Sequence, residues 1–152
     1  MKVLLDTNIL SRIVEPWHVQ HCAALDATDT LGKQKHDLVL VPQILYEFWA
    51  VCTRPLNANG LGRTVMEAEK ELANFKSLFS VLDESPLTLA KWEKLIVSYH
   101  VVGKNAHDAH LAAAMAAHGI THLLTFNDQD FRRYAGITVL TPDAILNSPA
   151  SP

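Results

Sequence analysis

Five short apolar runs, separated by segments with helical patterns, constrain most strongly how this chain can fold. They cover residues 2–5, 38–41, 79–82, 122–126 and 137–140. Continuous apolar runs of this length are typical of strands that are buried on both faces of a parallel sheet. Because such strands alternate with helices, we expect an α/β fold, namely a three-layer α/β/α sandwich around a mainly parallel sheet of about five strands.

The segments between the apolar runs have the caps and periodicities of helices. Pro42 fits the first position of a helix, and Thr141 followed by Pro142 is suited to cap a short last one. The other predicted helices cover residues 9–14, 17–27, 64–75, 88–101, 106–118 and 130–134. The helix that begins at Pro42 is expected to run to about Thr53, and the polar runs 29–37 and 56–62 predict loops.

Composition places the chain among ordinary globular proteins. Its 152 residues are 49% hydrophobic and 19% charged, and we expect one domain over residues 1–146 with a flexible tail at 147–152. No apolar run reaches the ~18 residues of a membrane span, and Asp6 introduces a charge where a signal peptide has its apolar core. Cys22 and Cys52 lack CxxC spacing, which favours buried free thiols in a reducing cytoplasm.

Three acidic residues occupy positions where the apolar patterns predict core. Asp6 ends the first apolar run, and Glu47 lies within the inward-facing stripe of the third predicted helix. Asp108 shares a helix face with Leu111 and Met115, at the i+3 and i+7 spacings of a core-facing stripe. A carboxylate at such a position is unfavourable unless it gains a proton, a hydrogen-bonding partner or a metal ion.

These acids are expected to meet at one edge of the sheet. Ligand sites of open parallel sheets lie at the carboxyl ends of the strands, where Asp6 follows the first run and Asn127, Asp128 and Asp130 follow the fourth. Carboxylates gathered there repel one another, and a hard divalent cation such as Mg²⁺ or Mn²⁺ removes that repulsion. The net charge of −3 gives no overall attraction to nucleic acid, so phosphate contacts must come from local charge or from a bound cation. The residues therefore predict a metal-dependent hydrolase of phosphate esters.

Four motifs follow one another in a fixed order along the chain. They are Leu-Leu-Asp-Thr-Asn at 4–8, Glu47 in a helix, Asp-Ala-His-Leu-Ala-Ala at 108–113, and Leu-Leu-Thr-Phe-Asn-Asp-Gln-Asp-Phe at 123–131. In this order they resemble the motifs of the PIN domain family, over nearly the whole chain. The compact length is similar to that of the VapC-type ribonuclease toxins of bacterial toxin–antitoxin pairs.

The resemblance implies that Asp6, Glu47 and Asp108 are catalytic acids that also bind Mg²⁺ or Mn²⁺. The implied reaction is metal-assisted hydrolysis of RNA phosphodiester bonds by an endoribonuclease, which leaves 5′-phosphate and 3′-hydroxyl ends. The expected partners are the RNA substrate, a cognate antitoxin and, as an option, a second copy of the chain. All of this is expected to take place in the cytoplasm.

The fourth acidic position departs from the family pattern. Members of the family often have Thr-x-Asp after the fourth strand, whereas this chain has Asn127 two residues after Thr125. We predict Asp130 as the fourth catalytic and metal-binding acid, with Asn127 as a neutral ligand or water-positioning group, and Asp128 as the remaining alternative. Thr125 and Asn8 are expected to donate the hydrogen bonds that orient the carboxylates.

Basic residues and helices outside the acidic motifs are candidates for partner contacts. Arg12 and Lys104 are close in sequence to two of the acids and are predicted to contact RNA phosphates. The predicted helices 17–27 and 64–75 are expected to form the antitoxin or dimer surfaces. His107 and His110 invite a zinc site, but neither shares the stripe of Asp108, so solvated histidines are predicted.

Several other readings of these residues stay open. Asp6, Thr7 and Asn8 are good helix caps, and Glu47 is an ordinary solvated residue if the helix phase shifts by one position. Alternative functions are a PIN nuclease that processes RNA without an antitoxin, and a PIN-like RNA-binding module without catalysis, which Asn127 favours. A haloacid-dehalogenase-type phosphatase is disfavoured, because no second Asp stands two residues after Asp6.

Overall fold

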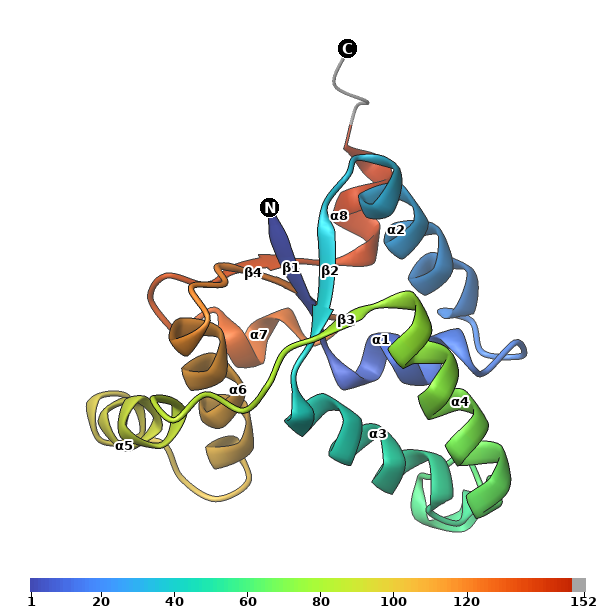
Figure 1. The fold of residues 1–152 in the computed structure, drawn as a ribbon, viewed down its shortest axis with the longest axis horizontal. Helices are drawn as coiled ribbons and strands as arrows, with labels where there is room; N and C mark the ends of the chain where they lie inside the picture. The colour runs from blue at the N-terminus through green and yellow to red at the C-terminus, as the bar shows by residue number, and fades with distance from the viewer. Residues whose placement is uncertain (149–152) are drawn as a thin grey trace.

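The computed structural model describes residues 1–148, which form an α/β fold around one parallel sheet (Figure 1). The strand order is β3-β2-β1-β4-β5, and every pairing is parallel. The strands are β1 (Lys2–Leu5), β2 (Asp37–Leu40), β3 (Ser80–Val81), β4 (His122–Leu124) and β5 (Thr138–Leu140). The expected parallel sheet of about five strands is therefore confirmed.

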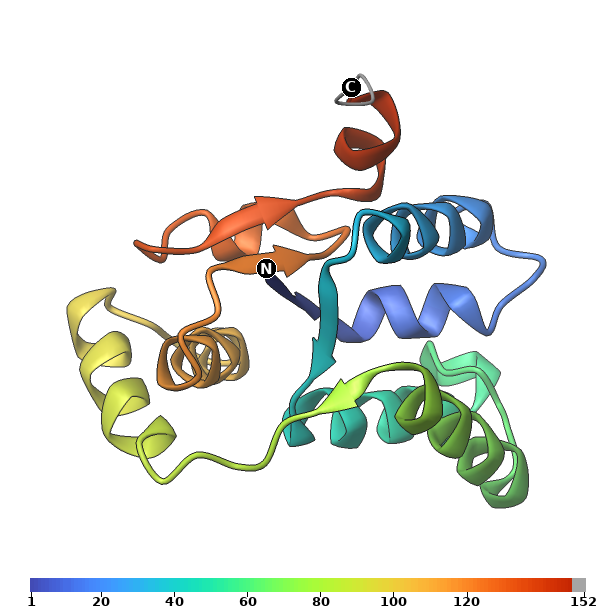
Figure 2. The same cartoon turned by 45° about the horizontal axis from the view of Figure 1, so that its top comes forward.

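Helices cover both faces of this sheet. They are α1 (Thr7–Ile13), α2 (His21–Lys33), α3 (Pro42–Thr53), α4 (Val65–Leu78), α5 (Thr88–Ser98), α6 (Asn105–Ala117), α7 (Asp128–Phe131) and α8 (Pro142–Asn147), with a 3-10 turn at Leu56–Ala58. Figures 1 and 2 agree in placing α5 and α6 on the opposite side of the sheet from α1 to α4. Within these layers α5 packs against α6, and α1 contacts both α2 and α3.

The central strand, β1, is buried from Val3 onwards because helices cover both faces of the sheet. Val3, Leu4 and Leu5 follow one another in β1, and each is 0% exposed. Successive side chains of a strand point to opposite faces, so a run without any exposure requires cover on both sides. The sequence pattern of continuous apolar residues thus produces the three-layer α/β/α sandwich that it predicts.

The strand order reverses direction at β1, which lies between β2 and β4. At this reversal the backbone N–H of Asp6 donates to the carbonyl of Leu124 at 3.0 Å. The N–H of Thr125 in turn donates to the carbonyl of Leu140 at 3.0 Å. These bonds bring the residues that follow β1 and β4 side by side, at the place where open parallel sheets form ligand sites.

The second helix differs from its prediction. It was expected over residues 17–27 and followed by a loop at 29–37, and both of these expectations are wrong. The helix begins at His21 and continues to Lys33, while β2 already starts at Asp37. The connection between the helix and the strand is therefore limited to residues 34–36.

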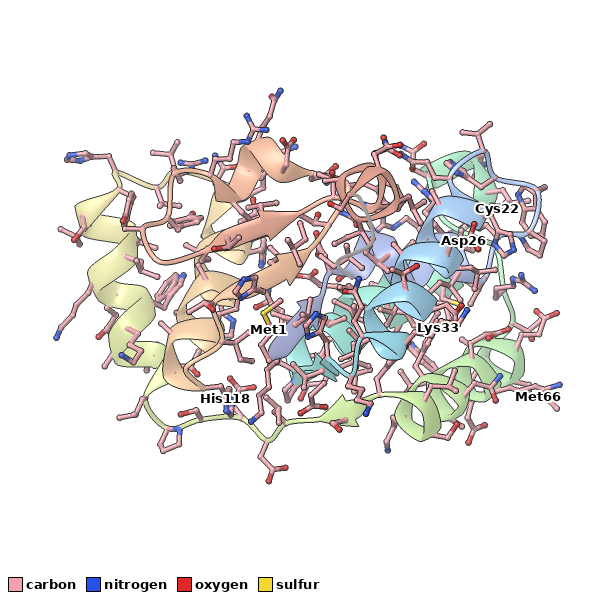
Figure 3. The ribbon with its side chains drawn as sticks, turned by 90° about the horizontal axis from the view of Figure 1, so that it is seen from above. Met1, Cys22, Asp26, Lys33, Met66 and His118 are labelled. Atoms are coloured by element: carbon pink, nitrogen blue, oxygen red, sulfur yellow. The ribbon has the colours of Figure 1, made fainter. Side chains whose placement is uncertain are left out.

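The helix continues to Lys33 because a stripe of buried residues runs through a segment that is otherwise polar. The buried side chains of α2 recur with helical spacing, at Ala24, Ala27, Thr28 and Leu31. Cys22, Asp26 and Lys33 are exposed along the same helix (Figure 3). Leu31 is the one buried leucine of this helix, and it holds the last turn against the core although its sequence neighbours are polar or Gly.

Smaller differences concern the ends of elements. The helix predicted at 130–134 begins two residues earlier, at Asp128, and ends three residues earlier, at Phe131. Helix α8 includes Asn147, the first residue of the predicted tail. The end of that tail, residues 149–152, lies outside the described residues. Cys52 is a buried free thiol as expected, whereas Cys22 is free but exposed. Across residues 1–148, none of the helices combines the length and the apolar character that crossing a bilayer requires.

Candidate functional site

A pocket of about 510 Å³ opens at the reversal of the sheet, between α1, α3, α6 and α7. Seven of the predicted site residues line it: Asp6, Asn8, Arg12, Glu47, Asp108, Asn127 and Asp130. They come from segments up to 124 positions apart in the chain, and the fold brings them to one place. We call this the acid pocket.

Asp6 is the most deeply buried of these acids, at 7% exposure, and its carboxylate is held on both oxygens. Its Oδ1 accepts from the backbone N–H of Thr7 at 2.7 Å. Its Oδ2 accepts from Asn8 Nδ2 at 2.9 Å and from Thr125 Oγ1 at 2.6 Å. Asn8 is fixed in turn, because its Oδ1 accepts from the N–H of Phe126 at 3.1 Å.

Glu47 is half-buried on α3 and receives one hydrogen bond on each carboxylate oxygen. Thr7 Oγ1 donates to Oε2 at 2.8 Å, and Gln43 Nε2 donates to Oε1 at 2.7 Å. Sequence reasoning assigned neither residue to this carboxylate. Gln43 was detectable, because it precedes Glu47 by four positions on a helix and such pairs are neighbours. Thr7 was not, because its contact depends on how α1 packs against α3.

Burial and like charge together raise the pKa of Asp6. Loss of hydration is the largest cause and raises it from 3.8 to about 6. Hydrogen bonds from Thr125 and Thr7 oppose this shift, while the charges of Glu47 and Asp108 add to it. The ionised form of the Asp6 carboxylate is therefore destabilised as long as no cation is near it.

Asp108 and Asp130 complete the acid pocket from α6 and α7. Partial burial, followed by the charges of Asp130 and Glu47, raises the pKa of Asp108, while the charges of Arg133 and His107 act in the opposite direction. Within residues 1–148, neither the Asp108 nor the Asp130 side chain accepts a hydrogen bond from the protein. Their oxygens are thus free to hold water or a cation.

The structure separates the three candidates for the fourth position. Asp130 and Asn127 line the acid pocket, whereas Asp128 lies outside it and forms an ion pair with Arg132 one turn later on α7. The backbone N–H of Asn127 donates to Thr125 Oγ1 at 2.9 Å. This geometry supports Asp130 as the fourth acid, and Asp128 as a structural residue.

The two predicted RNA-contact residues differ in position. Arg12 lines the acid pocket, but its guanidinium forms an ion pair with Glu15 and donates from Nε to Gln20 Oε1 at 3.1 Å. Lys104 precedes α6 and is not among the residues that line the pocket. The ion pairs found within residues 1–148 involve none of the four predicted acids. None of the four acids therefore forms an ion pair in this part of the chain, and the charges of Arg133 and His107 offset the repulsion at Asp108 only in part.

This donor set fits a hydrated hard cation. All four acids offer carboxylate oxygens, which Mg²⁺ and Mn²⁺ prefer, and a positive ion would relieve the repulsion that raises the pKa of Asp6 and Asp108. Among residues 1–148, no group of three or more His, Cys, Asp or Glu side chains is placed to hold a metal ion. Mg²⁺ needs no such group, because it keeps several waters and binds through one or two carboxylates.

An acid pocket at the reversal point of a parallel α/β sheet defines a class of sites suited to bind a cation and a phosphate ester. The family model of the PIN domain matches residues 3–137. The chain therefore belongs to the PIN domain family. No curated protein sequence matched this chain.

Solved structures with the same fold include components of toxin–antitoxin systems. The structure of VapBC2 from Rickettsia felis, bound to a DNA fragment from its promoter, matches with a TM-score of 0.72 and 17% identity over 93% of this chain and 98% of that chain. A toxin–antitoxin complex from Klebsiella pneumoniae gives 0.64 and 21%, over 92% and 97%. VapC20 from Mycobacterium tuberculosis, a toxin that cleaves the sarcin–ricin loop, gives 0.61 and 17%, over 89% and 98%. At these identities the likeness concerns the fold.

Proposed function

We propose that this protein is a Mg²⁺- or Mn²⁺-dependent endoribonuclease that hydrolyses RNA phosphodiester bonds. The observation that carries the proposal is the acid pocket itself. In a chain of the PIN domain family, Asp6, Glu47, Asp108 and Asp130 line one cavity and lack a basic partner within residues 1–148. We infer that these four acids are catalytic and bind the metal.

The residues of the acid pocket divide into two groups by their hydrogen bonds. Asp6 and Glu47 are immobilised by donors on both oxygens, so they are suited to fix the position of a cation. Asp108 and Asp130 keep free oxygens, so they are suited to orient an attacking water in line with the scissile bond. A bound divalent ion would polarise a phosphoryl oxygen and lower the pKa of that water.

A cognate antitoxin is the partner that the pocket chemistry favours, which makes the protein the toxin of a type II toxin–antitoxin pair in the cytoplasm. Four carboxylates without a basic partner attract an Arg or Lys of an inhibitor, whose charge would take the place of the metal. Several solved relatives are toxin–antitoxin complexes. Helix α4, which packs against α3, exposes Val65, Met66 and Leu78, which suits a protein partner or a second copy of the chain.

The test is RNA cleavage by the purified protein with and without metal. Cleavage is expected with Mg²⁺ or Mn²⁺ and absent with a chelator. Asp6→Asn and Asp108→Asn should each reduce the rate at least ~100-fold, because each removes a charge that holds the cation. Asp128→Asn is the matched control, since this acid lies outside the acid pocket and is expected to keep the wild-type rate. Unchanged cleavage in both pocket variants would rule out the proposed site.

One observation favours a second function. Asn127 lines the acid pocket where the family pattern has an acid, which weakens the cation site by one charge. A PIN module that binds RNA without cutting it is the corresponding alternative. Measurable RNA affinity without cleavage at saturating Mn²⁺ would establish it. An active nuclease that co-purifies with no small protein partner would instead indicate an RNA-processing enzyme without an antitoxin.

A further inference from the structure

Gln43 connects the acid pocket to helix α6 through three contacts of its side-chain amide. Its Nε2 donates to Glu47 Oε1 at 2.7 Å and to the backbone carbonyl of His107 at 2.9 Å. Its Oε1 lies 2.5 Å from His110 Nδ1. The amide therefore bridges α3, which carries Glu47, and α6, which carries both histidines.

The chemistry of the partners fixes the orientation of this amide. A backbone carbonyl and an ionised carboxylate only accept hydrogen bonds, so the NH₂ group of Gln43 must face His107 and Glu47, and both of its hydrogens are used. The oxygen of the amide then faces His110, whose Nδ1 must carry a hydrogen and donate it. His110 was predicted to be solvated, but it is half-buried and its ring points at the bridge.

We propose that Gln43 and His110 are positioning residues for the Glu47 carboxylate. His110 holds the Gln43 amide, Gln43 holds Oε1 of Glu47, and Thr7 holds Oε2 from the opposite side. Because Asp108 lies on the same turn of α6 as His110, this helix sets the position of two pocket acids, one directly and one through the bridge. The effect on catalysis rests on the proposed nuclease function.

Three substitutions separate this role from simple packing. His110→Leu and Gln43→Met keep side-chain bulk but remove the hydrogen bonds, whereas His110→Asn retains an N–H donor near the place of Nδ1. His107→Ala is the matched control, because His107 contributes only its backbone carbonyl to the bridge and its side chain is exposed. Thermal unfolding of each variant shows whether it is folded before the other measurements are made.

Mn²⁺ affinity without RNA is the first readout. Loss of a residue that orients a metal ligand lowers metal affinity ~10–100-fold, so this loss is expected for His110→Leu and Gln43→Met. His110→Asn should recover at least part of it, and His107→Ala should bind like the wild type. In RNA cleavage, His110→Leu and Gln43→Met should lower kcat and leave KM for RNA nearly unchanged. Wild-type Mn²⁺ affinity in both His110→Leu and Gln43→Met would overturn the proposal.

Hydrogen exchange of the Gln43 side-chain amide is the second readout, and it does not depend on activity. In the wild type both protons should exchange slowly with solvent, as seen by NMR, and both should exchange fast in His110→Leu. Fast exchange in the wild type would show that the bridge does not form. If the wild type binds no Mn²⁺ and cleaves no RNA, the proposed nuclease function fails, and slow or fast exchange then decides the bridge by itself.

Discussion

Replacing Asp6 by Asn should stabilise the metal-free protein at neutral pH while abolishing the proposed activity. The pKa of Asp6 rises from 3.8 to about 6 on folding, chiefly because burial removes hydration from the carboxylate. At ~1.4 kcal/mol per pKa unit, ionised Asp6 destabilises the fold by about 3 kcal/mol above pH 6. A neutral side chain of the same shape avoids this destabilisation.

The stabilisation by Asp6→Asn is reduced by the loss of one hydrogen bond. An Asn at position 6 has one NH₂ group where Asp has a second acceptor, and Oδ2 of Asp6 accepts from Asn8 and Thr125. The Thr125 hydroxyl cannot turn and accept instead, because it already accepts from Asn8 Nδ2 at 3.0 Å and from the N–H of Asn127 at 2.9 Å. The amide oxygen of the new Asn therefore takes the place of Oδ2, and its NH₂ group faces the backbone N–H of Thr7, whose hydrogen bond is lost. One lost bond costs about 1 kcal/mol, so the net stabilisation by Asp6→Asn is about 2 kcal/mol at pH 7.5.

The sign of the effect should change with pH. Folded Asp6 holds its proton more tightly than unfolded Asp6, so the stabilisation by protonation is complete below pH 3.8 and is lost as the pH rises through about 6. At pH 4 the wild type has almost no ionised Asp6 in its folded state, and the lost hydrogen bond makes Asp6→Asn the less stable protein.

Urea unfolding in the presence of a chelator measures the free energy of unfolding of the wild type and of Asp6→Asn, at pH 4 and at pH 7.5. Asp83→Asn serves as the control, because Asp83 is an exposed loop residue outside the acid pocket. A variant of Asp6 that is inactive because it misfolds would lose stability at both values of pH. Asp6→Asn that is less stable than the wild type at pH 7.5 would refute the conclusion that burial holds an unfavourable charge at this position.

Two further predictions concern stability away from the acid pocket. Gly32 lies in the exposed face of α2, and a Cβ there would meet nothing within 4 Å, so Gly32→Ala should raise the free energy of unfolding by ~0.5–1 kcal/mol in urea titrations. No change would mean that residues 28–33 are not helical in solution. The hydroxyl of Tyr134 is buried without a hydrogen-bond partner in residues 1–148, so Tyr134→Phe should stabilise the protein by ~1 kcal/mol. A loss of stability would show instead that an ordered water or another group binds this hydroxyl.

The sequence by itself determined the sheet and four of the five acids that line the acid pocket, since only Glu15 was not predicted. Short apolar runs mark buried strands, because only a strand covered on both faces needs consecutive apolar residues. Asp6 was recognisable because it ends such a run, and Asp108 because it interrupts an apolar helix face. These signals are local, since each depends on residues within one or two turns of the chain. Local patterns also predicted α3 with both of its ends, from Pro42 to Thr53.

The tertiary structure alone decided how the acids are held. Thr7 reaches Glu47 across 40 positions, and Gln43 meets His110 across 67. Thr125 was expected to orient a carboxylate, but only the structure shows that its partner is Asp6, 119 positions away. No periodicity records such contacts, because they depend on the packing of α1, α3 and α6 at the end of the sheet. The last turns of α2 were missed for the same reason, since Leu31 is the core contact that makes a polar segment helical. Composition specifies which groups are available, and long-range packing specifies which of them meet.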